Sequence, residues 1–363
     1  MKTKKLTAAV LAALLALSLL LSACSSAEET TAAPESTAAA ETPATEAEKT
    51  TEAPAAEAPT TEAATEAPTT AAVTEAATEA STAAAPGETI TITDMTGREV
   101  AVPQPVERIV ALSAADCEVL YAVGAGDMLV GRGEYCNYPA EVMDKPSVQS
   151  GYETNIEQII ALQPQVLLMS TMAQTEEQIA ALEKAGVAVV VSDAHTIEEV
   201  YQSIGIIGTL SGHQDEAAKV VQGMKDSLAE VAEKATGDGT ESVYFEVSPL
   251  EYGLWTAGKG TFMNEVAELL GLKNAFDDVE GWGEISEEQV LERNPDYIVT
   301  ITMYFGEGQT PEEEIAARPG WDAVTAVKNN KILRLQNEEL SRPGPRIADG
   351  AKLLFDLVYG NAQ

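Results

Sequence analysis

The chain has 363 residues and carries 58 acidic against 22 basic side chains, a net charge of −36 at neutral pH. This acidic excess argues against nucleic acid as a partner, because the phosphate backbone would repel it. The chain has only two histidines, too few for the histidine-rich clusters that usually bind zinc or manganese.

Residues 1–24 have the layout of an export signal. Three lysines stand among the first five residues, residues 6–21 are apolar, and small residues lead to Cys24. A secretory signal has this order, and the closing cysteine resembles the signal of a bacterial lipoprotein, in which that thiol takes a lipid. An uncleaved anchor is the alternative, but the apolar run is short for a bilayer span. We predict an exported chain, lipidated at Cys24 and held at the outer face of the cell membrane.

Residues 25–88 consist almost entirely of Thr, Ala, Glu and Pro and contain no aromatic residue. Such a composition cannot bury enough apolar area to offset the entropy of ordering, so we predict a disordered linker. Its like charges and prolines would keep it extended. The folded part is therefore expected over residues 89–363.

One motif occurs twice in the folded part. Asn155 and Ser286 are each suited to cap a short helix, and a glutamate follows two residues later, Glu157 or Glu288. In both copies a proline stands seven residues after the glutamate and precedes an apolar run typical of a buried strand. A common α/β connection with two solvated glutamates is the alternative interpretation. The shared spacing favours two similar lobes that each present one glutamate.

Strands and helices alternate around these motifs. Strands are expected at residues 89–94, 100–102, 108–112, 166–169, 187–191, 243–247, 297–299 and 331–335, and further helices at 113–122, 176–185, 196–210, 215–233, 262–270 and 347–358. This order favours parallel βαβ units. The helix over 215–233 has an apolar stripe at Ala218, Val221, Met224, Leu228 and Val231. We predict an N-terminal lobe (89–210), an interlobe helix (211–236) and a C-terminal lobe (237–363).

Five phrases in one order resemble a single family over nearly all of the folded part. They are Glu107-Arg-Ile-Val-Ala-Leu, Asn155-Ile-Glu-Gln-Ile, Trp255-Thr-Ala-Gly-Lys, Ile285-Ser-Glu-Glu-Gln-Val-Leu and Ser341-Arg-Pro-Gly-Pro-Arg346. The family comprises substrate-binding proteins of ATP-driven bacterial importers, in the class that carries cobalamin, haem and iron-siderophores. The resemblance implies an α/β fold of two lobes, each with a mainly parallel central sheet flanked by helices. One long rigid helix would join the lobes, and the ligand cleft would lie between them.

The same resemblance implies a permease as partner. In that family one surface glutamate per lobe docks on arginines of the membrane permease, and these positions fall on Glu157 and Glu288. Such contacts set register and encounter rate more than affinity, and they should weaken with salt. We expect a monomer without catalytic activity and without a cofactor of its own.

The predicted ligand is cobalamin or a related corrinoid. The ligand-binding residues implied by the resemblance are Tyr135, Tyr138, Tyr152, Trp255, Trp282, Glu338 and Arg342. Trp282 matches a pocket tryptophan six residues before the docking glutamate, and aromatic faces suit a large flat macrocycle. This chain lacks the tryptophan that many cobalamin binders carry before the first docking glutamate, and Tyr152 stands in that region.

Two other metal chelates remain as alternatives. Haem would need an axial His, Tyr or Met, and His195 and His213 both stand in polar contexts typical of a surface. An anionic ferric siderophore would need converging cations. Arg132, Lys259, Arg342 and Arg346 could supply them.

Catalysis and adhesion are the other function classes. Residues 253–260 nearly match a phosphate-binding loop, but Gly260 stands where Ser or Thr must hold magnesium. A surface adhesin or sensor would have no use for paired docking glutamates. Cys117 and Cys136 are left as free thiols or one disulfide, since export permits oxidation.

Overall fold

The structure is a computed structural model that describes residues 87–150, 154–171, 175–302, 304, 306, 308–335 and 338–360. All described residues belong to one compact unit, residues 77–363. The predicted signal with Cys24, most of the predicted linker and the candidate Tyr152 lie outside the described residues.

The first lobe is built on a parallel sheet. Its strands, in the spatial order β5-β4-β3-β6-β7, are all parallel to their neighbours. Their bounds are β3 (Ile109–Ala111), β4 (Leu129–Gly133), β5 (Ser147–Val148), β6 (Val166–Met169) and β7 (Ala188–Val191). A separate antiparallel hairpin precedes them, formed by β1 (Thr89–Thr93) and β2 (Glu99–Pro103). The helices of this lobe are α1 (Ala114–Ala122), α2 (Ile156–Ala161), α3 (Glu176–Lys184) and α4 (Ile197–Ser211).

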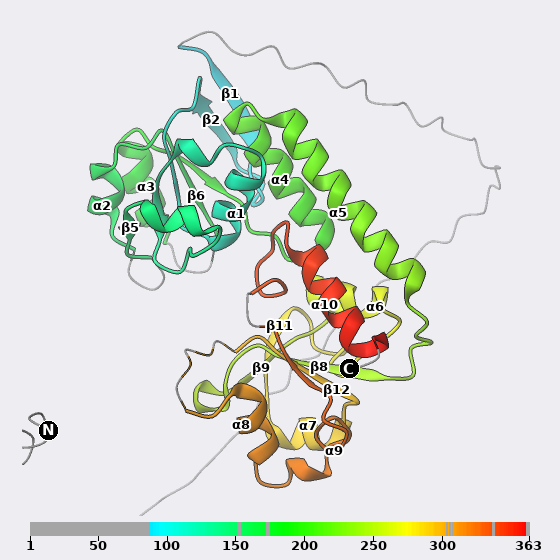
Figure 1. Ribbon diagram of the computed structural model, residues 1–363. Helices are drawn as coiled ribbons and strands as arrows, with labels where there is room; N and C mark the ends of the chain where they lie inside the picture. The colour runs from blue at the N-terminus through cyan, green and yellow to red at the C-terminus, as the bar shows by residue number, and fades with distance from the viewer. Residues whose placement is uncertain are drawn as a thin grey trace, which may run out of the picture. The chain divides into compact units, whose positions relative to one another are not determined.

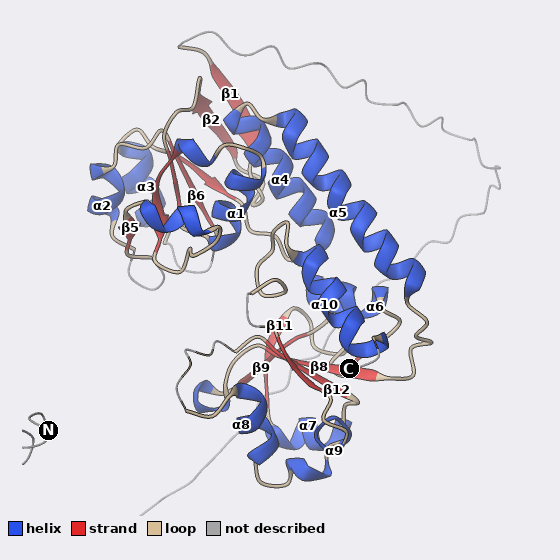
Figure 2. Cartoon of the chain, in the orientation of Figure 1, coloured by secondary structure: helices blue, strands red, loops and turns tan. Residues whose placement is uncertain are grey.

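The second lobe is built on a mixed sheet. The order is β11-β9-β8-β12-β13, with β10 beside β8, and β9 is antiparallel to both of its neighbours, β8 and β11. The strands are β8 (Ser242–Glu246), β9 (Leu254–Ala257), β10 (Lys273–Asn274), β11 (Trp282–Ile285), β12 (Tyr297–Thr300) and β13 (Ile332–Arg334). The helices are α6 (Phe262–Leu269), α7 (Glu287–Arg293), α8 (Pro311–Ala317), α9 (Thr325–Lys328) and α10 (Ile347–Tyr359). Figure 2 shows each group of strands with its flanking helices. The α/β architecture is confirmed, although only the first sheet is wholly parallel.

The two motif copies fold as equivalent units. α2 leads into β6 and α7 leads into β12, and these strands hold the same place in their sheets. The side chains of Asn155 and Ser286 accept hydrogen bonds from the backbone N–H three residues on, at 3.0 and 3.3 Å. The residue before each proline, Gln163 or Asn294, has a left-handed backbone with φ of 49° or 45°. The two copies of the motif therefore also share a left-handed residue before the proline, which the sequence pattern did not predict.

A long helix, α5 (Gln214–Lys234), follows α4 and packs against both α4 and α10 (Figure 1). Gly212, with φ of 75°, ends α4 in the left-handed conformation that glycine adopts without cost. The buried side chains of α5 are Ala217, Met224, Leu228 and Val231. The prediction for Ala218 is wrong: Ala218 is exposed and Ala217 is buried, since two helical turns back from Met224 reach Ala217.

Alternate residues of the central strands enter different apolar clusters, as a pleated strand requires. Ile109, Ala111, Val243 and Phe245 belong to one cluster that also includes residues of α4, α5, α6 and α10. Their neighbours on the other faces pack under α2 and α3 in the first lobe and under α7 and α8 in the second. One apolar cluster is thus shared by both lobes. Among the described residues, no helix combines the length and apolar character needed to cross a membrane.

Candidate functional site

A network of charged side chains joins the two lobes. Glu118 on α1 is only 3% exposed. Its carboxylate accepts hydrogen bonds from Arg342 Nη1 at 3.1 Å and from Arg346 Nε and Nη2 at 2.9 and 2.6 Å. Burial opposes the charge of Arg346, but the hydrogen bonds and charge of Glu118 outweigh burial and raise the pKa of Arg346. A buried carboxylate of the first lobe is thus neutralised by arginines of the second.

Four predicted ligand-binding residues come together around this network. Arg342 Nη2 donates to the Tyr135 carbonyl at 3.2 Å, and Arg342 also pairs with the Glu338 carboxylate. The Arg346 guanidinium lies over the Tyr138 ring, 4.1 Å from its centroid. The Tyr135 side chain is 64% exposed and that of Tyr138 is 46% exposed. These rings are therefore available to a ligand and are not core residues.

Tyr135 and Tyr138 lie in the loop of residues 134–138, called the tyrosine loop below, and local structure explains its position. At Gly133, the last residue of β4, a Cβ atom would lie 2.2 Å from the Leu112 carbonyl oxygen. Glycine therefore lets the chain turn closely against the end of β3. Cys136 then lies buried beneath the loop, with Sγ 3.7 Å from the same Leu112 carbonyl oxygen. The burial of Cys136 leaves Tyr135 and Tyr138 on the outside.

A cavity of about 400 Å³ lies beside the tyrosine loop. It is lined by Glu118 and Tyr121 of α1, by Tyr138, and by Arg346 from the segment before α10. Segments of both lobes therefore form its wall.

The two predicted tryptophans lie in the second lobe, on the antiparallel ribbon of β9 and β11. Trp255 is paired with Glu284, and Trp282 is paired with Ala257, so both indoles are on one face of the ribbon. Trp282 is half-buried and packs against the Phe262 ring edge-on, with 5.7 Å between ring centroids. Trp255 is 39% exposed. Trp282 thus serves partly as a core residue, whereas Trp255 presents its ring.

A buried carboxyl group at the carboxyl edge of the first sheet was not predicted. Asp116 on α1 is 1% exposed, and Ser192, which follows β7, donates a hydrogen bond to its Oδ1 at 2.6 Å. Within the described part of the chain, Asp116 Oδ2 has no hydrogen-bond partner. Burial raises the pKa of Asp116 to about 7; the Ser192 hydrogen bond opposes this shift and the charge of Asp193 adds to it. The available signal was an aspartate in the otherwise apolar run Ala114-Ala-Asp-Cys117.

Of the four cations named for a ferric siderophore, Arg342 and Arg346 converge on Glu118, whereas Arg132 and Lys259 have other partners. Buried Arg132 donates to the carbonyls of Gly133 and Glu134, at 3.1 and 3.3 Å. Exposed Lys259 pairs with Glu280 at 3.4 Å, and the His195 side chain is exposed. The described side chains contain no group of three or more His, Cys, Asp and Glu residues arranged to hold a metal ion.

The two predicted docking glutamates lie on equivalent helices. Glu157 and Glu288 are exposed in the first turns of α2 and α7. At that helix start, the backbone N–H of Glu288 and the Ser286 hydroxyl lower the pKa of the Glu288 carboxyl. α2 and α7 each pack on the sheet face opposite the cluster shared by the lobes. Each lobe thus offers one carboxylate from the same structural context.

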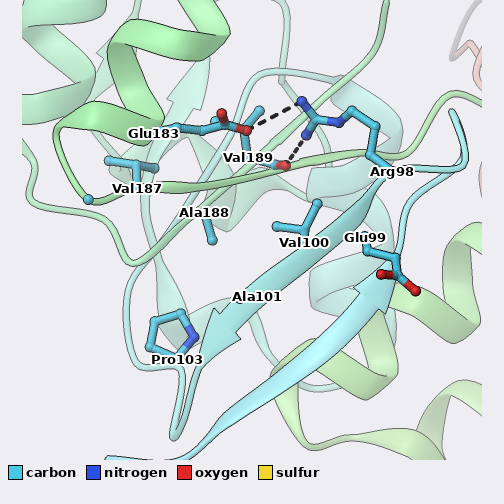
Figure 3. A pocket seen from close by; sticks show the side chains of 10 residues that line it. Arg98, Glu99, Val100, Ala101, Pro103, Glu183, Val187, Ala188 and Val189 are labelled. Carbon is cyan, nitrogen blue, oxygen red and sulfur yellow. Dashed lines mark hydrogen bonds and ion pairs between the residues drawn. The ribbon is translucent and has the colours of Figure 1, made fainter.

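A second cavity, of about 460 Å³, lies between β2 and β7 (Figure 3). Arg98 crosses one side of it, donates to the Val189 carbonyl at 2.6 Å and pairs with Glu183 at 3.4 Å. None of the predicted ligand-binding residues that the structure describes lines this cavity.

The structure has two α/β lobes joined through a long helix, and exposed aromatic rings lie beside the charged network between the lobes. These features are typical of the class of binding proteins whose two lobes are connected by a helix. The chain belongs to the family described as periplasmic binding proteins (Peripla_BP_2), which matches residues 109–339. It is a substrate-binding protein of an ABC transporter and not an enzyme.

Three similar proteins place the chain more closely. An uncharacterized ABC transporter substrate-binding lipoprotein of Bacillus subtilis, YvrC, is 34% identical over 276 residues, covering 74% of this chain and 85% of the relative. A possible iron-binding periplasmic protein of Staphylococcus epidermidis has a structure with a TM-score of 0.59 and 33% identity, covering 70% of this chain and all of that one. The periplasmic vitamin B12-binding protein BtuF of Vibrio cholerae has a structure with a TM-score of 0.60 and 26% identity, covering 71% of this chain and 99% of that one.

Proposed function

We propose that this protein captures cobalamin or a related corrinoid and delivers it to the permease of an ABC importer. The observation that carries the proposal is that the exposed rings of Tyr135 and Tyr138 lie beside the interlobe network of Glu338 and Arg342. Aromatic faces give a large flat macrocycle both apolar area and stacking. Trp255 offers a further exposed indole from the second lobe. Similarity to the vitamin B12-binding protein of Vibrio cholerae supports this choice of ligand.

The arginines at the site are already paired with carboxylates, which argues against a strongly anionic ligand. Arg342 and Arg346 are already engaged by Glu118, and Arg342 is also paired with Glu338. An anionic ligand would have to compete with these carboxylates for the guanidinium groups. A corrinoid side-chain amide can instead donate to a carboxylate or accept from an arginine without displacing the pair.

A titration of the full chain tests the ligand. We expect calorimetry to show binding of cyanocobalamin, and we expect Tyr135→Ala and Trp255→Ala each to weaken it about tenfold or more, which corresponds to about 1.4 kcal/mol. Tyr252→Ala is the matched control, because this tyrosine is 76% exposed and outside the predicted site. Absence of corrinoid binding would overturn the proposal.

A ferric siderophore or haem is the second candidate. It is favoured by the 33% identity to the possible iron-binding protein of Staphylococcus epidermidis. Tight binding of a ferric hydroxamate or of haem in the same titration, with no cyanocobalamin binding, would select it.

Delivery is proposed to use Glu157 and Glu288. We expect the double variant Glu157→Ala/Glu288→Ala to abolish ligand-stimulated ATP hydrolysis by the cognate permease while ligand affinity in solution stays unchanged. Glu177→Ala is the control, since Glu177 is an exposed glutamate in the first turn of another helix, α3. Wild-type stimulation should fall as salt is raised, because exposed charge pairs are screened. Full activity in the double variant would refute docking through these residues.

Lipid attachment at Cys24 is proposed to hold the exported protein at the membrane surface. The name of the Bacillus subtilis relative, a lipoprotein, supports this anchor. Cys24→Ala should move the protein from the membrane fraction to the soluble fraction; retention on the membrane would contradict the anchor.

A further inference from the structure

Two cysteines meet beneath the tyrosine loop. Cys117 lies in α1 and Cys136 in the loop of residues 134–138; both side chains are fully buried, and both thiols are free in the structure. Their sulfur atoms share one acceptor, the Ala111 carbonyl oxygen, at 3.8 Å from Cys117 Sγ and 4.0 Å from Cys136 Sγ. The two thiols are near enough to interact, since Cys136 raises the pKa of the Cys117 thiol. Neither thiol has a role in the proposed capture of ligand.

We propose that Cys117 and Cys136 form a disulfide in the exported protein, which links α1 covalently to the loop of residues 134–138. Each thiol loses its hydrogen, and the two sulfur atoms form one bond. The oxidant is a disulfide of the extracytoplasmic environment, small-molecule or enzyme-bound, which takes up the two hydrogens and the two electrons as a pair of thiols. Both sulfur atoms already lie within 4.0 Å of the Ala111 carbonyl oxygen, so the bond joins neighbouring segments.

The bond would form while the chain folds. In the folded reduced chain, the neighbouring Cys136 thiol raises the pKa of the Cys117 thiol well above its usual value, and burial and the nearby Asp116 act in the same direction. The thiolate is the reactive species in disulfide exchange. Burial and a raised pKa therefore suppress exchange after folding, and they would also protect the finished bond from reductants.

The cross-link would join segments that are already bridged by Arg342. Arg342 donates to the Glu118 carboxylate, next to Cys117 in α1, and to the carbonyl of Tyr135, next to Cys136 in the loop. A disulfide would thus hold the first lobe's contribution to the network in position. This consequence for the site rests on the proposed function, whereas the cross-link itself does not.

Peptide mapping tests the cross-link. The full chain is expressed with its own signal, isolated from the membrane fraction, and treated with iodoacetamide in denaturant before any reductant is added. Trypsin cuts after Arg132, between the two cysteines, and yields peptides 109–132 and 133–184. We expect these peptides to appear joined, and to separate only after dithiothreitol. Alkylation of both cysteines in the unreduced sample would overturn the proposal, whatever ligand the protein binds.

Thermal unfolding provides a second test. A bond that closes a loop of about 20 residues should raise Tm by roughly 5–10 °C. Wild type that is unfolded in denaturant with dithiothreitol and refolded in its presence should therefore have a Tm lower by this amount, whereas the same treatment should leave the Tm of Cys117→Ala/Cys136→Ala unchanged. Because each protein is compared with itself, the packing cost of the alanines cancels. An equal response of both proteins to reductant would contradict the proposal.

Discussion

Each lobe buries a carboxyl group near the end of its central strand, β3 in the first lobe and β8 in the second. The two carboxyl groups differ in the partners that compensate their charge. Glu246 ends β8 in the second lobe and is fully buried, and Arg318 binds both of its oxygens at 2.7 and 3.0 Å. Asp116 follows β3 in the first lobe and receives one hydroxyl hydrogen bond, from Ser192. A guanidinium can hold a carboxylate charged in the core, whereas a single hydroxyl cannot. Burial raises the pKa of both carboxyl groups: that of Asp116 reaches about 7, whereas for Glu246 the hydrogen bonds and charge of Arg318 oppose the shift.

Removing Arg318, the cation paired with Glu246, should have the largest effect on stability. Arg318→Met would leave Glu246 buried without its partner, and we expect a loss of about 3–5 kcal/mol in the free energy of unfolding. Urea denaturation measures this loss. Lys234→Met, which breaks an exposed pair with Glu230, should change stability little. A loss no greater than in this control would show that the Glu246 pair is not what stabilises the second lobe.

Replacing the proton-binding carboxyl should have the next largest effect. The pKa of Asp116 is about 7 in the folded chain, against 3.8 for an unperturbed aspartate, so the folded state binds more protons between these two pH values. Its contribution to stability is therefore present at low pH and is lost as pH rises from about 4 to 7.

Asp116→Asn keeps an acceptor for Ser192 and removes this titration. We expect it to be more stable than the wild type at pH 8 by up to about 4 kcal/mol, with a smaller difference at pH 5. Thermal unfolding across this pH range is the measurement. A pH-independent difference between the two proteins would contradict the assignment of this titration to Asp116.

The smallest expected effect concerns the left-handed residues before the two prolines. Asn tolerates this conformation better than Gln, so Gln163→Asn should stabilise the first lobe by roughly 0.5 kcal/mol. The reciprocal change, Asn294→Gln, should cost more, about 1–2 kcal/mol. Asn294 Oδ1 also accepts from Thr325 N and Oγ1, at 2.8 and 3.1 Å, and so caps α9. Equal and opposite effects in denaturant titrations would argue against this extra capping role.

Local signals made the repeated units predictable. Caps, prolines and apolar runs lie within a few residues of one another, and the structure places α2 before β6 and α7 before β12 accordingly. β4 was missed because two glycines and Arg132 interrupt its apolar run, and its burial comes from neighbouring strands. The antiparallel ribbon of β9 and β11 was missed because its partners are distant in sequence.

The interlobe network could not be predicted from local pattern. Glu118 and Arg342 are 224 residues apart, and Asp116 and Ser192 are 76 apart. A buried charge needs a partner, but the sequence alone does not indicate which distant residue folding will place beside it. The resemblance to known importers named Tyr135, Tyr138, Glu338 and Arg342 individually, and the structure brings them together.

The apolar cluster that passes through both lobes has a consequence for how the protein melts. Ile109 and Ala111 of β3, and Val243 and Phe245 of β8, share this cluster with residues of α5 and α10. Separating the lobes would expose this apolar surface to water on each half, at a cost proportional to its area. The folded part should consequently denature in a single calorimetric transition, and a chain cut at Gly212 should yield fragments that do not remain folded on their own.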